Sequence, residues 1–289
     1  MTTTAELYYQ LKALAEEPGD AFFVAKQTVE GYNYEVFLYR LASYTEFQKP
    51  GAFEARGITF IVENGKEPQI VSRPFAKFFN LGENPFTMNL DATTLQAAYT
   101  KLDGSLIATY QKKIKTSSGR EFFTLGFKSK GSLVSEHAQL ATEWFNQPTQ
   151  QAFKREVEDL TLSDYTVMLE LLSADPRLQI VLQYPETKLT VIGVRVNENG
   201  KLLSKASLDS ASFPEITKNW VEGVKLPRYS ERAAWLENVV SLKDIEGYVL
   251  HYPDQLVKVK TDWYRALHHT KDGLLSTEDV FLKGDEALL

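Results

Sequence analysis

The segment Lys101-Leu102-Asp103-Gly104 constrains this chain more than any other stretch, because it predicts a sharp strand-turn-strand junction with a lysine at its edge. Residues 97–101 and 106–112 are strand-like, and Asp-Gly between two strands is a strong hairpin signal. A lysine held at such a junction can act as a nucleophile. Since a Lys-x-Asp-Gly sequence arises by chance in about one chain in fifteen of this length, its meaning depends on other residues.

The order of the predicted elements favours an α+β fold with mixed, mainly antiparallel sheets and flanking helices. Aromatic and β-branched segments separated by turn signals indicate strands, and leucines at helical spacing indicate an N-terminal helix. We expect strands at 21–29, 34–41, 57–63, 97–101, 106–112, 121–128, 165–172, 179–183, 189–196, 247–252 and 256–260. We expect helices at 4–17, 132–146, 149–160 and 231–240, and another that begins near residue 262.

The 289 residues suffice for one large domain, and neither an internal repeat nor a low-complexity linker divides them. We expect residues 1–265 to form this domain and residues 266–289 to form a short helical tail with no separate C-terminal domain, because so few residues rarely hold a core. The N-terminus lacks a basic and apolar leader, and no segment reaches the length of a membrane span. These features predict a soluble, cytoplasmic protein.

Composition excludes several functions. Without cysteine, the chain cannot form disulfides, thiolate metal sites or a cysteine nucleophile, and it contains no P-loop. A net charge of -6 argues against a protein that coats nucleic acid through a global positive field. Contact with nucleic acid must then be local, and the candidate lysines are Lys112, Lys113, Lys115, Lys128 and Lys130. A solvated hairpin tip is the alternative for such clusters, and we expect Lys128 to be a surface residue.

Charged residues also occur inside segments that are otherwise apolar strands. They are Lys101, Glu170 in Met168-Leu169-Glu170-Leu171, Glu246 before Gly247-Tyr248-Val249, and Lys258 with Lys260. Strand alternation allows any one of them to face solvent. A charge on an inner face must be paired, coordinated or solvated in a cleft, because burial of an isolated charge is costly. The four together therefore indicate a shared polar site.

This combination resembles the covalent nucleotidyltransferase superfamily of ATP-dependent ligases and capping enzymes. Its successive motifs look like Lys101 to Gly104, Glu170, Ile192 to Arg195, Glu246-Gly247 and Lys258 to Lys260. Upstream of the lysine, Arg56-Gly57, Lys77 within Pro74 to Asn80, and Phe127 to Ser132 look like elements of the bacteriophage RNA ligase 1 family, which reseals broken tRNA. DNA ligases usually carry their Arg-Gly downstream. The resemblance covers residues 50–265 and implies a nucleotidyltransferase (adenylation) domain of the ATP-grasp-like ligase type.

The resemblance also implies a mechanism. Lys101 would attack the α-phosphorus of ATP, AMP would pass to an RNA 5′-phosphate, and an RNA 3′-hydroxyl would displace it, in the service of RNA repair. An amine attacks only when neutral, so we expect a bound metal, Lys258 and Lys260 to favour loss of the proton of Lys101. Lys258 and Lys260 would also neutralise charge on the α-phosphate.

The remaining roles are assigned by the same resemblance. Arg56 and Lys77 would hold outer phosphates or an RNA phosphate, and Lys130 would meet phosphate. Glu170 would accept hydrogen bonds from the ribose hydroxyls, and Glu246 would orient Mg²⁺ or Mn²⁺. Gly104 and Gly247 would let the backbone approach the nucleotide. Asp103 would orient the lysine or help hold the metal, or simply form a hairpin turn.

The expected partners are ATP and RNA with 5′-phosphate and 3′-hydroxyl ends, with tRNA as one candidate, bound by a monomer away from membranes. Longer members of the family carry a helical C-terminal domain associated with tRNA specificity, for which this chain has no room. Two other functions stay open: a DNA ligase or capping-type transferase of the same superfamily, and a catalytically inactive nucleotide-binding or RNA-binding module. The four histidines show no metalloprotease spacing.

Overall fold

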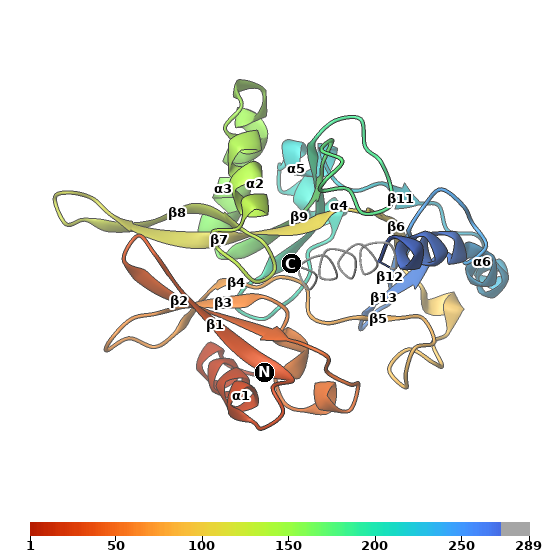
Figure 1. The fold of residues 1–289 in the computed structure, drawn as a ribbon. Helices are drawn as coiled ribbons and strands as arrows, with labels where there is room; N and C mark the ends of the chain where they lie inside the picture. The colour runs from red at the N-terminus through yellow and green to blue at the C-terminus, as the bar shows by residue number, and fades with distance from the viewer. Residues whose placement is uncertain (273–289) are drawn as a thin grey trace, which may run out of the picture. The chain divides into compact units, whose positions relative to one another are not determined.

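The computed structural model describes residues 1–272, and within them the strands form three sheets (Figure 1). These residues group into two compact units, and the chain passes between the units several times. The first unit contains Met1–Lys77, Ser105–Leu171 and Lys188–Val221, and the second contains Phe78–Gly104, Leu172–Thr187 and the residues from Glu222 onward. The predicted α+β class with mainly antiparallel sheets is confirmed.

The first unit begins with helix α1 (Thr4–Glu16), which starts at a capping box made by Thr3 and Glu6. An antiparallel sheet follows in the order β1-β2-β3-β4. Its strands are β1 (Phe22–Val29), β2 (Tyr32–Tyr39), β3 (Ile58–Val62) and β4 (Gln69–Ser72). The apolar face of α1 covers the sheet, because the ring of Tyr8 lies edge-on to Phe37 and Phe60. Strand β4 lies in a segment for which the sequence predicted no strand.

A second sheet in the first unit has the order β10-β9-β7-β8. Its strands are β7 (Ser105–Lys115), β8 (Glu121–Lys128), β9 (Tyr165–Leu172) and β10 (Lys188–Val196). Helices α2 (Glu136–Phe145) and α3 (Gln151–Leu162) lie beside each other over this sheet (Figure 1). They bury Phe145, Phe153 and Val157 against strand residues such as Leu169. Two short helices, α4 (Lys205–Ser210) and α5 (Pro214–Lys218), were not predicted.

The second unit contains a sheet in the order β11-β6-β12-β13-β5. Its strands are β5 (Phe79–Asn80), β6 (Ala97–Lys101), β11 (Gly223–Val224), β12 (Gly247–His251) and β13 (Leu256–Lys260). One face packs on α6 (Arg232–Val239), and its strand residues Ala98, Leu250, Val257 and Val259 are buried there. Because side chains alternate along a strand, Lys101, Lys258 and Lys260 lie on the opposite face. A helix follows from residue 262 to the end of the described residues.

Four expectations from the sequence were wrong. The Asp103-Gly104 turn joins no hairpin, because β6 pairs with β11 and β12 whereas β7 pairs with β8 and β9. Residues 179–183 form no strand, because the backbone N–H groups of Val181 and Leu182 donate to the carboxylate of Asp103 instead of to a neighbouring strand. Lys128 is fully buried and is not a surface residue. Lys113 is also buried rather than solvated at a hairpin tip, with its Nζ 2.8 Å from an oxygen of Glu63.

The predicted helix near residue 262 is confirmed, and residues 273–289 of the expected tail lie outside the described part. Across residues 1–272, no helix combines the length and the apolar character that a membrane crossing requires.

Candidate active site

Three of the predicted site residues form one row across the sheet of the second unit. Gly247, at the start of β12, pairs with Lys101 on one side and with Lys260 on the other. Residues paired across strands point their side chains to the same face, and neighbouring strands lie about 4.8 Å apart. The two lysines therefore flank a position that carries no side chain.

Gly247 is required by this geometry. Its φ of 154° is one that residues with a side chain rarely adopt, and a Cβ atom there would lie 1.8 Å from the carbonyl oxygen of Val259. The role expected of Gly247 from the sequence was close approach of the backbone to a nucleotide. The structure adds that the two strands themselves approach too closely for any other residue.

Lys101 is held by the residue that precedes this glycine. Its Nζ lies 2.9 Å from Oε1 of Glu246, whose side chain is 5% exposed. Burial raises the pKa of Glu246, although the charge and the hydrogen bond of Lys101 act in the opposite direction. Burial also lowers the pKa of Lys260, and repulsion from Lys101 adds to this effect. The second unit thus concentrates two amines around one buried carboxylate.

Asp103 anchors the turn that follows Lys101. Its carboxylate accepts hydrogen bonds from the N–H groups of Val181 (2.8 Å) and Leu182 (2.7 Å) and from the hydroxyl of Tyr264 (2.7 Å). With three donors on its two oxygens, this carboxylate fixes the backbone beside Lys101. The structure therefore supports the positioning role of Asp103 among those expected from the sequence.

Lys258 lies two residues before Lys260 on the same face of β13, and its Nζ is 5.7 Å from the centre of the Phe78 ring. Gly104 ends the turn after Lys101 and is the last residue of its segment in the second unit. Both residues were predicted from the sequence, and the structure places both in the unit that contains Lys101.

The other predicted residues belong to the first unit, where three cations surround Tyr39. The Nζ of Lys77 donates to its hydroxyl at 3.1 Å, and the Nζ of Lys130 lies 5.5 Å from its ring centre. Arg56 is within hydrogen-bond reach of the same hydroxyl. Burial opposes ionisation of Tyr39, but the hydrogen bond from Lys77 and the three positive charges outweigh it and lower the pKa of Tyr39. A site with this positive electrostatic potential suits an anion such as phosphate.

Sequence reasoning missed Tyr39, because a tyrosine in a strand is most simply explained by packing. Glu170 lies on β9, opposite Leu106, and its charge acts on Arg56. Burial lowers the pKa of Arg56, whereas attraction from Tyr39 and Glu170 raises it. The first unit thus brings Arg56, Lys77, Lys130 and Glu170 into one polar cluster around Tyr39.

Lys128 holds two parts of this cluster together. Its Nζ donates to the carbonyl oxygens of Gly57 and Lys130, each at 3.0 Å. Burial lowers the pKa of Lys128 to about 7. A neutral amine has two N–H donors, which these two carbonyls satisfy, and within residues 1–272 no carboxylate pairs with it. Lys128 therefore connects the residue that follows Arg56 to Lys130.

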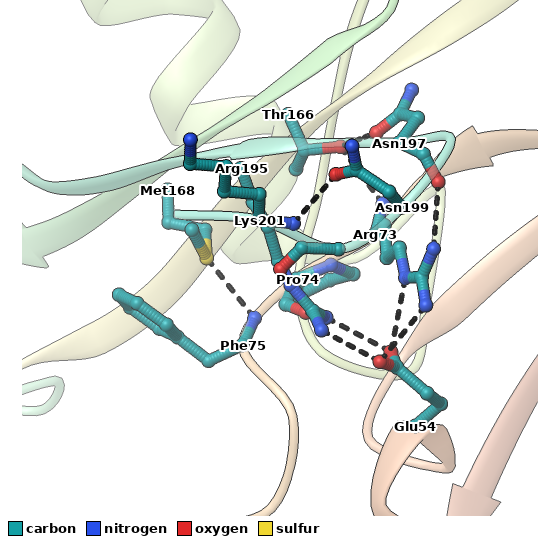
Figure 2. A network of polar contacts seen from close by, with 11 residues as sticks. Glu54, Arg73, Pro74, Phe75, Thr166, Met168, Arg195, Asn197, Asn199 and Lys201 are labelled. Carbon is teal, nitrogen blue, oxygen red and sulfur yellow. Dashed lines mark hydrogen bonds and ion pairs between the residues drawn. The ribbon is translucent and has the colours of Figure 1, made fainter. Parts of the chain in front are cut away.

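A buried ionic network is centred on Glu54, two residues before Arg56. The guanidinium groups of Arg195 and Arg73 converge on the carboxylate of Glu54, with shortest distances of 2.6 Å and 3.1 Å (Figure 2). Arg73 also donates to the carbonyl of Asn197, and Arg195 donates to that of Pro74. Arg195 belongs to a motif recognised in the sequence. In this network it pairs with Glu54, which lies two residues before Arg56.

The residues around Lys101 fit a divalent cation that is held partly by a substrate. Among residues 1–272 no cluster of three or more histidine, aspartate or glutamate side chains could form a complete metal cage. Mg²⁺ at nucleotide sites typically uses one or two carboxylates and takes its other ligands from phosphates and water. Glu246, buried and bonded to an ammonium that a metal could replace, provides such a carboxylate.

Solved structures of other proteins share this arrangement of sheets and helices. An archaeal ATP-dependent RNA ligase, solved in two forms, aligns with TM-scores of 0.56 and 0.54 at 17% and 16% identity. The alignments cover 89% and 84% of this chain, and 62% and 60% of the archaeal chains. At this level of identity the likeness establishes the fold.

Sequence comparison identifies the family. The profile of the T4 RNA ligase 1 family, described as RNA ligase, matches residues 54–264. The chain therefore belongs to this RNA ligase family, as the motifs around Arg56 and Lys101 predicted. A "Putative RNA ligase" of Thermovibrio ammonificans is 29% identical over 89% of this chain, and RNA ligase 1 of bacteriophage TS2126 is 26% identical over 90%. The chain spans only 63% and 62% of the lengths of these two relatives.

Proposed function

We propose that this chain is an ATP-dependent RNA ligase that joins RNA 3′-hydroxyl and 5′-phosphate ends through a lysyl-AMP and an RNA-adenylate. The observation that carries the proposal is the row of Lys101, Gly247 and Lys260 with Glu246 beside it. In a chain of the RNA ligase family, this row presents a nucleophilic amine next to a second cation and a carboxylate. Residues 1–265 would form the adenylating domain.

In the first step the neutral amine of Lys101 attacks the α-phosphorus of ATP. A P–N bond forms, the bond from the α-phosphorus to the bridging oxygen breaks, and pyrophosphate leaves with that oxygen and its electron pair. The amine must lose one proton to solvent before the attack, which ends its ion pair with Glu246 (2.9 Å), and a second one after the P–N bond forms.

The other residues act on charge and position. Lys260, and Lys258 on the same face, would stabilise the negative charge that develops on the α-phosphate. In the first unit, Arg56, Lys77 and Lys130 around Tyr39 form a cluster for phosphates of ATP or RNA. Glu170 remains our candidate for the ribose hydroxyls. Gly104 and Gly247 would permit close approach of the nucleotide.

Glu246 would hold Mg²⁺ or Mn²⁺ together with phosphate oxygens, and the ion would supply positive charge that favours the neutral form of Lys101. In the later steps, an RNA 5′-phosphate oxygen would attack the lysyl-linked phosphorus and release the amine. An RNA 3′-hydroxyl would then attack the 5′-phosphate and release AMP. RNA repair, with tRNA as one candidate, would be the purpose of this joining.

The proposal is tested by ligation of matched substrates. The full chain, ATP and MgCl₂ are incubated with a 5′-phosphorylated single-stranded RNA, with DNA of the same sequence, and with the RNA carrying a 5′-hydroxyl. We expect joined or circular product from the phosphorylated RNA only, and none from the Lys101→Ala variant. Preferential joining of DNA would favour a DNA ligase, and no product from any strand would contradict the proposed activity of this chain.

A further inference from the structure

The second unit contains a cavity outside the row of Lys101, Gly247 and Lys260. It has a volume of about 620 Å³ and lies between residues 80–83 and the helix that starts at residue 262. From the helix, Tyr264, His268 and Asp272 follow one another at four-residue spacing, and Arg265 with His269 adds the adjacent positions. This spacing places all five side chains on one helix face. The volume is within the range of pockets that hold small ligands.

Two cations, Lys260 and Arg265, line this cavity beside two carboxylates. Of its two carboxylates, Asp272 pairs with His268 at 3.0 Å, and Glu83 accepts the N–H of Asn80 at 2.9 Å. Arg265 forms no ion pair with any carboxylate of residues 1–272. Lys260 lies close enough to Arg265 and Lys101 for both to lower its pKa, after burial as the largest cause. A bound phosphate would relieve this repulsion.

Asn80 adds a separate indication of a ligand. Its backbone groups are occupied, because the N–H donates to Glu83 and the carbonyl accepts from the hydroxyl of Thr87 at 2.7 Å. The side-chain oxygen is buried and has no hydrogen-bond partner within residues 1–272. A buried polar atom without a partner costs free energy. The hydroxyl group of a ligand both donates and accepts, so it could pair with either the oxygen or the nitrogen of the Asn80 amide.

The cavity is also connected to the proposed reaction centre inside the same unit. Lys260 lines the cavity and stands in the row with Lys101. Tyr264 lines it as well, and its hydroxyl donates to Asp103, two residues after Lys101. A strand bound in the cavity would therefore have its end close to the group that Lys101 carries.

We propose that this cavity binds the 5′-phosphorylated terminal nucleotide of an RNA strand, with the phosphate on Arg265 and Lys260 and a ribose hydroxyl on Asn80. The proposal rests on the proposed ligase function, and it names the place of one substrate. A 2′-hydroxyl distinguishes RNA from DNA, so contact at Asn80 would contribute to the choice of sugar. The rings of His268 and His269 would offer surfaces for stacking.

The test measures binding in the absence of ATP, so that it stands whether or not the chain adenylates itself. Fluorescent single strands are titrated with the full chain: 5′-phosphorylated RNA, the same RNA with a 5′-hydroxyl, and 5′-phosphorylated DNA of the same sequence. The variants are Arg265→Ala and Asn80→Leu. Arg228→Ala is the matched control, because Arg228 is an exposed arginine of the second unit that does not line the cavity.

We expect Arg265→Ala to weaken binding of 5′-phosphorylated RNA by about tenfold, with loss of the preference over the 5′-hydroxyl strand. Asn80→Leu should weaken RNA binding by about fivefold and reduce the preference for RNA over DNA, because one hydrogen bond is lost. Arg228→Ala should bind like the parent chain. The proposal is wrong if both cavity variants bind as the parent does, or if the parent shows neither preference. It is also wrong if Arg265→Ala weakens ATP binding while RNA binding is unchanged, since the cavity would then hold phosphates of ATP.

Discussion

Gly247 and Val259 approach so closely across the β12–β13 pair that a Cβ atom at position 247 would lie 1.8 Å from the carbonyl oxygen of Val259. The contact involves backbone atoms, which cannot move aside as a flexible side chain could. It fixes the distance between the strand that follows Glu246 and the strand that carries Lys258 and Lys260. The row of site residues therefore depends on this glycine.

We predict that Gly247→Ala destabilises the fold by more than about 3 kcal/mol, because it combines an unfavourable φ with a backbone collision. The matched control is Gly223→Ala on β11 of the same sheet. A Cβ at position 223 would meet only the Tyr99 ring at 3.6 Å, which is an ordinary contact. Urea unfolding of both variants measures the difference. Equal stability of the two variants would contradict the close approach of Gly247 and Val259.

Tyr264 and Asp103 form a buried hydrogen bond of 2.7 Å that joins the helix after β13 to the turn after Lys101. We predict that Tyr264→Phe lowers the free energy of unfolding by about 1–3 kcal/mol, because a carboxylate loses one of its donors. Tyr229→Phe, at an exposed tyrosine of the same unit, should have little effect. In a double-mutant cycle, Asp103→Asn and Tyr264→Phe should cost less together than the sum of the two. Strict additivity would show that the bond contributes nothing to stability.

The buried amine of Lys128 makes stability depend on pH. Its folded pKa of about 7 lies below the unfolded value of 10.5, so between these values the unfolded chain binds one more proton than the folded chain. The contribution of Lys128 to the free energy of unfolding therefore rises with pH across that window, by about 1.4 kcal/mol per pH unit. Below the folded pKa, both states bind the proton and the gain is absent.

We predict that Lys128→Met removes this slope, which can be measured as the difference in unfolding free energy between parent and variant from about pH 7 to pH 10. Lys115→Met, at an exposed lysine of β7, serves as the control and should keep the slope of the parent. If parent and Lys128→Met show parallel pH dependence, Lys128 is charged in the folded state and the neutral-amine description is wrong.

The carboxylate of Glu54 balances the positive charge of two buried guanidinium groups, those of Arg73 and Arg195. We predict that Glu54→Gln destabilises the fold by about 3–5 kcal/mol, because it leaves these charges buried without a counter-ion. Glu67→Gln, at an exposed glutamate of the same unit, should change stability by less than about 0.5 kcal/mol. Thermal unfolding compares the two. Similar melting temperatures would show that water or other groups compensate the arginines.

Much of the fold and the lysine row could be predicted because their signals are local. Alternating apolar residues predict β6 and β7 on either side of the turn after Lys101, and the pattern Leu256 to Lys260 predicts β13 with both lysines on one face. The hairpin expected from Asp103-Gly104 does not form, because the two strands join different sheets. The family resemblance, now confirmed, supplied the order of the motifs. The functional roles of the site residues remain predictions.

The misses share a physical cause, since each depends on contacts between residues distant in the sequence. The apolar run Ile180 to Leu182 resembles a strand, but its N–H groups are taken by Asp103, about eighty residues earlier. Lys128 resembles a surface lysine until Gly57 and Lys130 supply carbonyls around it. Tyr39 gains its unusual environment only when Arg56, Lys77 and Lys130 come together. No local pattern contains that information.

The most direct test of the central claim is the intact mass of the purified chain before and after incubation with ATP and MgCl₂, beside Lys101→Ala. The account predicts that the parent gains, or already carries, the mass of one AMP, that pyrophosphate removes it, and that peptide mapping places it on Lys101. The variant should carry none while unfolding like the parent. AMP on the Lys101→Ala chain, or a folded parent that never acquires AMP with either Mg²⁺ or Mn²⁺, would contradict the assignment of Lys101 as the nucleophile.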